Sequence, residues 1–237
     1  YQVLARKYRP QFFSELIGQD TIVETLTNAF KLNRIAHAYL LTGIRGIGKT
    51  TTARLIARTI NCENLESNNF ESCNKCDSCK SIYRETNMDV LEMDAASRTG
   101  VEDVREIIEN VKYKPVSSKY KIFIIDEVHM LSKSAFNALL KTLEEPPPHV
   151  VFIMATTDVH KIPSTILSRT QKFDFKPISV NEISKYLKQI LDHDKISYEE
   201  KGISLIAQKA DGGLRDALSL LDQVIAYANE KLNAETV

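Results

Sequence analysis

The stretch "GIRGIGKT" at residues 43–50 constrains the fold of this chain more than any other feature. It matches the phosphate-binding loop G-x-x-x-x-G-K-[ST], which requires a strand before it and a helix after it. The apolar run "AYLL" precedes the loop and the helical pattern "TTARLIARTI" follows it. A chance glycine-rich turn would not have this context. The glycines allow backbone N–H groups to face phosphate oxygens, and the start of the helix adds a favourable dipole.

The loop therefore predicts a site for a nucleotide and Mg²⁺. We expect the ammonium of Lys49 to reach the β- and γ-phosphates and the hydroxyl of Thr50 to hold Mg²⁺. The residues expected around the phosphates are Gly43, Ile44, Arg45, Gly46, Ile47, Gly48, Lys49, Thr50 and Thr51.

A pair of acidic residues follows the apolar run in "IFIIDEVH", at residues 122–129. Four apolar residues end in Asp126, which places its carboxylate at the C-terminal edge of a buried strand, where α/β sheets bind ligands. We expect Asp126 to support the Mg²⁺ indirectly or through water, and Glu127 to orient or deprotonate an attacking water. An exposed acidic turn is the alternative. Combined with the phosphate loop, the pair favours hydrolysis over phosphorylation of a small molecule.

Short apolar segments rich in Val, Ile and Phe alternate with helical patterns along the first 177 residues. The apolar segments are continuous, which indicates strands buried on both faces and therefore a parallel sheet between helices. The chain is thus predicted to have an α/β fold. Strands are expected at 36–43, 88–95, 121–127, 150–157 and 171–175, and helices at 20–32, 49–61, 101–112 and 133–144, the last ended by the prolines of "EEPPP".

After Pro177 the pattern predicts helices only, at 180–193, 199–210 and 213–229. Their apolar residues recur at intervals of three and four. We therefore predict an α/β domain at 1–177 and a small helical lid domain at 178–237. The sequence starts at Tyr1 without Met and stops at "NAETV", so we expect a longer protein with a further C-terminal region.

The charges of the chain balance, with 31 Lys and Arg against 31 Asp and Glu and a net charge of +0. This disfavours a protein that coats nucleic acid through bulk positive charge, so any DNA contact requires a local patch or assembled subunits. No apolar run approaches the ~18–20 residues that cross a bilayer, and the start lacks the apolar core of a signal peptide. We expect no membrane association and a cytoplasmic location.

All four cysteines, Cys62, Cys73, Cys76 and Cys79, fall in one insert at 62–79. The spacing C-x10-C-x2-C-x2-C fits a Zn²⁺ site with four thiolates, which has no open position and is structural. Disulfides and free thiols are the alternatives. A cytosolic compartment disfavours the first, and two overlapping C-x2-C steps disfavour the second. The polar segment "ENLESNNFES" has too little apolar content to pack alone, so we expect the metal to hold the insert in shape.

Seven segments occur together in the chain: "YQVLARKYRP", "GIRGIGKT", the four-cysteine insert, "DAASRTGVEDVRE", "IDEVHMLSKSAFNALLKTLEEPP", "ATTDVHKIPSTILSR" and "GGLRDALSLLDQ". In this order they resemble the AAA+ ATPases and, among them, the motor subunits of bacterial DNA polymerase III clamp loaders. The resemblance covers essentially all 237 residues. It implies a P-loop AAA+ sheet domain with a zinc insert, a three-helix lid, and ATP as the nucleotide.

The resemblance also implies roles for residues outside the phosphate loop. Thr157 matches a polar sensor beside the γ-phosphate and the attacking water; a strand-terminal threonine that caps a turn is the alternative. Arg215 matches a second sensor, which reaches from the lid to the γ-phosphate; an exposed i,i+4 pair with Asp211 is the alternative. With "KYRP", Ile17 and Gly18 resemble the wall of the adenine pocket.

Arg169 has no acidic residue between Ile162 and Asp174 to pair with, and a solvated surface arginine is the default interpretation. The resemblance implies instead that it reaches into the ATP site of a neighbouring subunit and completes the charge around the γ-phosphate. Its lack of a local partner fits a group that acts on another subunit. The segment reads Ser168-Arg169-Thr170 where the family usually has Ser-Arg-Cys, which leaves the arginine intact.

The biological role implied by the resemblance is the loading of a sliding clamp. ATP binding organises a spiral with other clamp-loader subunits that opens the ring, and hydrolysis on primed DNA releases the ring closed. Arg98 and Arg105, in or beside the helix at 101–112, are candidate contacts to DNA phosphates. Salt bridges with Glu102 and Glu106 on a solvated helix face are the alternative.

Three other functions stay open from the sequence. A branch-migration or helicase-loading ATPase would share the fold, but is not expected to carry the zinc insert. A non-hydrolysing scaffold would not need Lys49, Asp126, Glu127 and Arg169 together. A nucleic-acid-binding zinc module is disfavoured by the near-neutral charge and by the few basic residues within 62–79.

Overall fold

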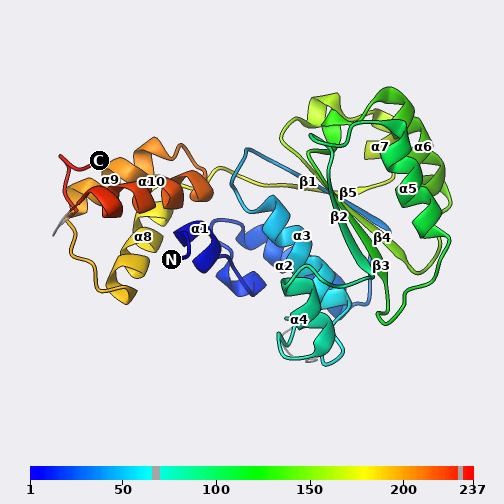
Figure 1. Cartoon of the computed structure of the whole chain (residues 1–237), viewed down its shortest axis with the longest axis horizontal. Helices are drawn as coiled ribbons and strands as arrows, with labels where there is room; N and C mark the ends of the chain where they lie inside the picture. Colours follow the sequence, from blue (N-terminus) through cyan, green and yellow to red (C-terminus); the bar gives the residue numbers. More distant parts are fainter. Residues whose placement is uncertain (66–69, 229–231) are drawn as a thin grey trace.

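A computed structural model describes residues 1–65, 70–228 and 232–237, and this part of the chain has the predicted α/β fold (Figure 1). A sheet with helices on both faces is followed by a group of three helices. Two parts of the predictions lie outside the described residues, namely 66–69 in the cysteine insert and residue 229 at the end of the last predicted helix. None of the described helices is long and apolar enough to cross a bilayer.

The sheet consists of parallel strands in the order β2-β3-β4-β1-β5. All five predicted strands are confirmed to within two residues. Because parallel strands place their carboxyl ends at one edge, the segments that follow β1, β3 and β4 meet there. The strands are β1 (Ala38–Thr42), β2 (Val90–Asp94), β3 (Lys121–Asp126), β4 (Val150–Thr156) and β5 (Gln171–Asp174).

Successive side chains of the central strands alternate between two cores. In β3, Ile122 and Ile124 belong to the core shared with α2 and α3, whereas Phe123 and Ile125 belong to the core shared with α5 and α6. This double burial explains the continuous apolar runs of the sequence. The prediction of burial on both faces is wrong for β2, where Leu91 is 37% exposed, because β2 is an edge strand and is covered incompletely.

The predicted helices are all present, with described ends within two residues of the predictions. Ser132 caps α6 and Ser179 caps α8, each through a side-chain oxygen that accepts a backbone N–H. The predicted helices are α2 (Asp20–Lys31), α3 (Lys49–Ile60), α5 (Val101–Val111), α6 (Lys133–Glu144), α8 (Val180–His193), α9 (Glu200–Lys209) and α10 (Leu214–Tyr227). Shorter helices that the sequence did not predict are α1 (Leu4–Lys7), η1 (Phe13–Glu15), α4 (Asp77–Tyr83), η2 (Val128–Met130), η3 (Val159–Lys161) and α7 (Ser164–Leu167).

The start of the chain lies against the lid helices (Figure 1). The N–H of Leu4 donates to Oδ2 of Asp222 in α10 at 2.8 Å, and the ammonium of Lys7 donates to Asp194 after α8 at 2.8 Å. The hydrogen bonds of Lys7 and Tyr8 lower the pKa of Asp194 to about 2. The first residues of the chain are thus held by its last helices, and the segment after them crosses back to the sheet.

Candidate nucleotide site and candidate metal site

The predicted phosphate loop joins β1 to α3. Gly46 and Gly48 have φ angles of 75° and 108°, which L side chains rarely adopt. Helix α3 begins at Lys49, so its first-turn N–H groups, which have no helical acceptor, lie at the end of the loop. Ile47 is 3% exposed and packs in the core, so only its backbone can serve a ligand, whereas Ile44 is 40% exposed.

The ammonium of Lys49 is buried at the phosphate loop. Its Nζ donates to the carbonyl oxygens of Gly43 at 2.7 Å and Ile44 at 2.6 Å, and the residue is 6% exposed. Burial lowers the pKa of Lys49, and the negative charges of Glu127 and Asp126 oppose this shift. A buried cation whose hydrogen-bond partners are neutral carbonyls is suited to pair with a phosphate.

The two residues predicted for Mg²⁺ are in direct contact. The hydroxyl of Thr50 donates to Oδ2 of Asp126 at 2.8 Å, although 76 positions separate them. Oδ1 of Asp126 accepts the N–H of Glu127 at 2.9 Å, which fixes the carboxylate at the end of β3. Their oxygen atoms suit a hard cation such as Mg²⁺.

Glu127 has a left-handed backbone, with φ of 50°. Such a conformation costs about 1–3 kcal/mol for a non-glycine residue and is found preferentially at functional sites. Its Oε2 accepts the hydroxyl of Thr157 at 3.1 Å and lies 3.5 Å from Nε2 of His129. Nδ1 of His129 lies 2.9 Å from Oγ1 of Thr156 at the end of β4. Thr157 therefore contacts the carboxylate that the sequence assigns to the attacking water.

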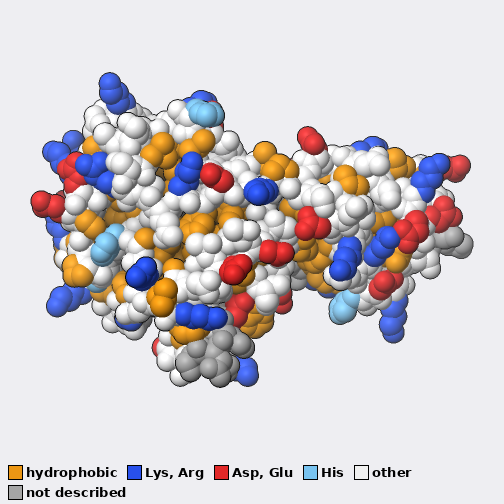
Figure 2. All heavy atoms as spheres, turned by 180° about the vertical axis from the view of Figure 1, so that it is seen from behind, with side chains coloured by type: hydrophobic (Ala, Val, Ile, Leu, Met, Phe, Trp, Pro, Cys, Tyr) orange, Lys and Arg blue, Asp and Glu red, His pale blue; other side chains and the backbone are white. Residues whose placement is uncertain are grey.

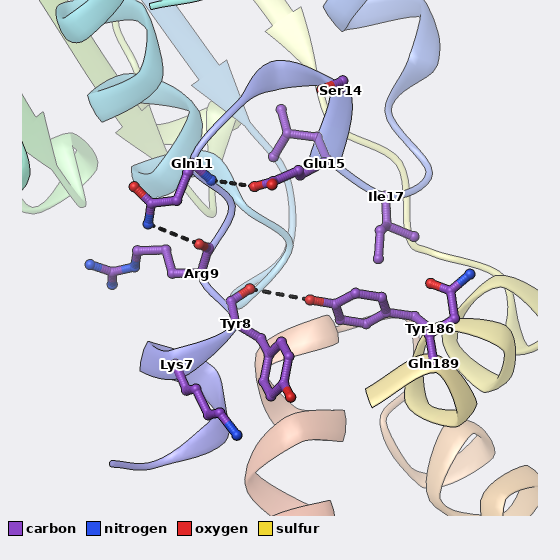
Figure 3. Close-up of a pocket in the computed structure, with 10 residues that line it drawn as sticks. Lys7, Tyr8, Arg9, Gln11, Ser14, Glu15, Ile17, Tyr186 and Gln189 are labelled. Carbon is purple, nitrogen blue, oxygen red and sulfur yellow. Dashed lines mark hydrogen bonds between the residues drawn. The ribbon is translucent and has the colours of Figure 1, made fainter. Parts of the chain in front are cut away.

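A cavity of about 450 Å³ lies between the N-terminal segment and the lid (Figure 3). Tyr186 of α8 borders it, and its hydroxyl donates to the carbonyl of Tyr8 at 3.2 Å. Leu16 adjoins the phosphate loop, because a Cβ on Gly48 would lie 3.8 Å from its Cδ2. The lining residues are Lys7, Tyr8, Arg9, Gln11, Ser14, Glu15, Leu16, Ile17, Tyr186 and Gln189.

The residues predicted for the adenine-pocket wall, "KYRP" with Ile17 and Gly18, do not all line this cavity: Lys7, Tyr8 and Arg9 do, and Pro10 does not. Ile17 lines the cavity. Gly18 packs against the lid instead, where an added Cβ would lie 3.3 Å from Ile178, and it is not among the lining residues.

The lid reaches the phosphate loop at the start of α10. The N–H of Arg215 donates to the carbonyl of Gly46 at 3.0 Å. A Cβ on Gly46 would lie 2.9 Å from Cβ of Arg215, so this approach requires glycine. Asp211 precedes α10, which begins at Leu214, so it is not one helical turn from Arg215 and the surface-pair alternative does not hold.

The expectation that Arg169 lacks a local partner is wrong. Its Nη2 lies 3.0 Å from Oε1 of Glu144, and its Nη1 donates to the carbonyl of Thr165 at 2.7 Å. Glu144 ends α6, outside the window 162–174 in which the sequence contains no acid. Helix α7 packs through Ile166 into the core with α5 and α6, on the opposite face of the sheet from α3. Arg169 therefore lies on the side of the sheet away from the phosphate-loop helix.

Arg98 and Arg105 form the salt bridges considered as their alternative. Nη1 of Arg105 lies 2.5 Å from Glu102, and Nη1 of Arg98 lies 3.9 Å from Glu106. All four side chains are more than half exposed. Exposed pairs contribute about 0–1 kcal/mol, so they can exchange partners readily, and a DNA contact stays a prediction.

The four cysteine sulfur atoms lie within 4.8 Å of one another. The sulfur atoms of a tetrahedral zinc site lie about 3.8 Å apart for bonds of about 2.3 Å. None of the four cysteines forms a disulfide, and the N–H of Cys73 donates to Sγ of Cys62 at 3.3 Å. Burial raises the pKa of Cys73, but the N–H groups of Lys75 and Cys76 and the other thiols bring it down to about 7. The cluster could therefore hold one metal ion with thiolate ligands.

Comparison with known proteins agrees with this geometry. A family model described as DNA polymerase III, delta subunit, matches residues 18–179, and one described as DNA polymerase III clamp loader subunit, ATPase lid domain, matches residues 182–230. The chain belongs to this family of DNA polymerase III clamp-loader subunits. The DNA polymerase III subunit tau of Bacillus subtilis is 50% identical over 235 residues, and the subunit gamma of Buchnera aphidicola from Acyrthosiphon pisum is 50% identical over 237 residues.

The chain spans 41% of the length of the Bacillus subunit and 65% of the Buchnera subunit, while 99% and 100% of the chain are covered. A solved structure, the Thermotoga maritima RuvB Holliday junction branch migration motor, has a TM-score of 0.67 and 20% identity, covering 97% of this chain and 70% of that one. At this identity the likeness shows the fold alone. The predicted AAA+ fold and family resemblance are confirmed, and the branch-migration and scaffold alternatives are not favoured.

Several residues at the candidate site were not identified from the sequence. They are Gln11, Ser14, Glu15, Leu16, Tyr186 and Gln189 at the cavity, His129 at Glu127, and Glu144 at Arg169. Tyr186 and Gln189 are three positions apart on α8, so the sequence indicates that they share one helix face. It does not indicate which part of the chain packs against that face.

Proposed function

We propose that the chain is the ATP-hydrolysing part of a clamp-loader motor subunit, which opens a ring-shaped sliding clamp and loads it onto primed DNA. The observation that carries this proposal is the meeting of two side-chain pairs at one sheet edge: Thr50 with Asp126, and Glu127 with Thr157. The pairs connect the start of α3 with the end of β3, and the residue after β3 with the residue after β4, at the position where α/β sheets bind ligands. A scaffold that does not hydrolyse ATP has no need of this arrangement.

The roles at this edge follow from the chemistry of each group. Lys49 and the loop N–H groups hold the phosphates, and Glu127 orients or deprotonates the attacking water, with Thr157 beside it. Thr50 would hold Mg²⁺ with support from Asp126, and the ion would supply positive charge to the phosphates. Arg215, whose backbone is bonded to the phosphate loop, would report on nucleotide from the lid.

The cavity beside Leu16 is the proposed site of the adenine base. Its volume lies within the range of about 300–1,000 Å³ that is usual for small-molecule sites. Burial lowers the pKa of Arg9, the positive charge of Arg54 lowers it further, and Arg215 acts in the same direction. Glu85 and Glu92 oppose this shift, and both also form ion pairs with Arg54. A bound triphosphate would add negative charge beside Arg9 and favour its charged form.

The proposed partners are other clamp-loader subunits, the sliding clamp and primed DNA. On the face shown in Figure 2, basic and acidic side chains are interspersed over both the sheet domain and the lid, without a continuous basic surface. Because the chain as a whole has a net charge of +0, DNA contacts are expected from assembled subunits rather than from one copy. We place the protein in the cytoplasm, a compartment that keeps cysteine thiols reduced.

The test is ATP hydrolysis by the complete clamp-loader complex that contains this chain. The rate should rise when the sliding clamp and primed DNA are both present, because the loading cycle ends in hydrolysis on DNA. If the rate of ATP hydrolysis does not change when clamp and DNA are added, the motor would be assigned to another process. Absence of hydrolysis under all conditions would favour a scaffold.

We further propose that the cysteine cluster binds Zn²⁺ as a structural site. Metal analysis of the purified protein should find about one zinc per chain, as expected for a single site with four ligands. Cys79→Ser should lose the metal and lower the melting temperature. Ser78→Ala is the matched control, because the buried hydroxyl of Ser78 has no hydrogen-bond partner among the described residues. The assignment would be contradicted if protein freshly prepared under reducing conditions contained no zinc and its cysteines formed disulfides.

A further inference from the structure

Residues 11–16, here called the strap, connect the lid-bound start of the chain to the sheet domain. Gln11, Ser14, Glu15 and Leu16 of the strap line the cavity (Figure 3). Its only helical element is η1, of three residues, which is too short to be stable alone. The conformation of this wall of the cavity must therefore be held by other parts of the chain.

Glu71 of the cysteine insert holds the middle of the strap. Its Oε2 accepts the N–H of Phe13 at 2.8 Å, and its Oε1 accepts the N–H of Ser14 at 2.9 Å. Charge-assisted bonds of this kind are stronger than neutral ones. Phe13 is 1% exposed and packs against Phe30 of α2. This contact holds the same part of the strap in place. Glu71 stands two positions before Cys73.

The first residue of the strap is held in the same way. The carbonyl of Gln11 accepts Nδ2 of Asn74 at 3.1 Å, and Oε1 of Gln11 accepts Nη1 of Arg58 at 2.9 Å. Asn74 lies between the ligands Cys73 and Cys76. Arg58 of α3 is 4% exposed, and its Nη2 also donates to the carbonyl of Gln11.

None of these contacts involves the side chains of Ser14 and Leu16, which line the cavity. Glu71 bonds to backbone N–H groups, and Asn74 bonds to a backbone carbonyl. The loop that carries both residues, 71–76, also carries two of the four cysteines. Rigidity in the cysteine cluster is therefore transmitted to the strap through hydrogen bonds and not through contact with a ligand.

We propose that Glu71 and Asn74 are positioning residues of the nucleotide site. They hold the strap where its side chains form the wall for the base and ribose of a nucleoside triphosphate. This inference rests on the proposed function, because it takes the cavity as the base-binding part of the site. It assigns the cysteine insert a task in nucleotide affinity, in addition to its own stability.

The test is Glu71→Gln in the full chain, measured by ATP affinity, tripolyphosphate affinity and hydrogen exchange of the strap. Glutamine keeps the size of glutamate, but its amide nitrogen cannot accept, so one of the two backbone bonds is lost. ATP should bind roughly tenfold more weakly, the effect of losing about one charge-assisted hydrogen bond. Tripolyphosphate, which needs only the phosphate loop, should bind as before. Amide exchange in 11–16 should be faster without any ligand.

Glu63→Gln is the matched control. Glu63 lies in the same insert and accepts the N–H of Ser78 at 3.2 Å, with no described contact to the strap. It should leave both affinities unchanged. In the wild-type chain, removal of the zinc by a zinc-selective chelator, with Mg²⁺ kept in excess, should speed strap exchange and weaken ATP binding as Glu71→Gln does. If Glu71→Gln does not fold, Asn74→Asp gives the same readouts, because it replaces the donor to Gln11 with a repelling oxygen.

The outcomes separate this inference from the proposed function. A wild-type chain that binds neither ATP nor tripolyphosphate contradicts the proposed function, while strap exchange still reports on Glu71. Unchanged ATP affinity in Glu71→Gln overturns the inference. Equal weakening of ATP and tripolyphosphate also overturns it, because the effect then arises from the phosphate loop or from global destabilisation.

Discussion

Glu127→Gln in the assembled clamp loader should bind ATP with wild-type affinity and hydrolyse it roughly 10²–10⁴-fold more slowly, the usual contribution of a general base. Glutamine keeps the shape of glutamate and can still accept the hydroxyl of Thr157, which lies 3.1 Å away in the native chain. What it lacks is the negative charge that orients or deprotonates water. Steady-state hydrolysis and equilibrium binding of ATP measure the two quantities separately.

Lys49→Ala is the control that separates binding from chemistry. It removes the buried ammonium at the phosphate loop, so the charge of the triphosphate is unmatched and ATP binding should be lost. A Glu127→Gln complex that hydrolyses ATP at the wild-type rate would show that another group acts on the water. His129, 3.5 Å from Glu127, would then be the next residue to test.

The fold was predictable because its strongest signals are local. A strand such as β3, buried on both faces, appears as a continuous apolar run, and the prolines of "EEPPP" mark the end of α6. Helices α4 and α7, of seven and four residues, are too short to show two turns of periodicity. The partial exposure of β2 depends on the order of the strands in the sheet, which the hydrophobic pattern of the sequence does not predict.

The candidate site was predictable only where chemistry and position coincide in one motif. Lys49 and Thr50 are defined by the phosphate loop, and Asp126 by the end of a strand. The cavity wall combines residues near position 16 with α8, and the Arg169–Glu144 pair spans 25 positions. Such contacts depend on how the lid and α6 pack. The sequence around one partner does not indicate which residue the other partner is.

Arg169→Ala should bind ATP but hydrolyse it about 10³–10⁵-fold more slowly in the assembled complex, the range for an arginine that stabilises charge on the transferring phosphoryl group. The ion pair with Glu144 does not oppose this role. Both side chains are substantially exposed, 33% and 46%, and such pairs contribute about 0–1 kcal/mol, so the guanidinium can exchange Glu144 for a phosphate at small cost. Glu144→Gln is therefore the matched control and should change the rate only a few-fold.

Loss of activity in Arg169→Ala does not by itself show that the arginine acts on a neighbouring subunit. Complexes that mix Arg169→Ala with Glu127→Gln subunits make that distinction, since each variant alone is inactive. An Arg169→Ala subunit keeps Glu127, and a Glu127→Gln subunit keeps Arg169. Where the nucleotide site of the first faces the arginine of the second, one site has both groups. Partial hydrolysis should therefore return on mixing. Helix α7 packs on the opposite sheet face from α3, which favours action between subunits. A mixed complex as inactive as either parent would assign Arg169 a role within its own subunit.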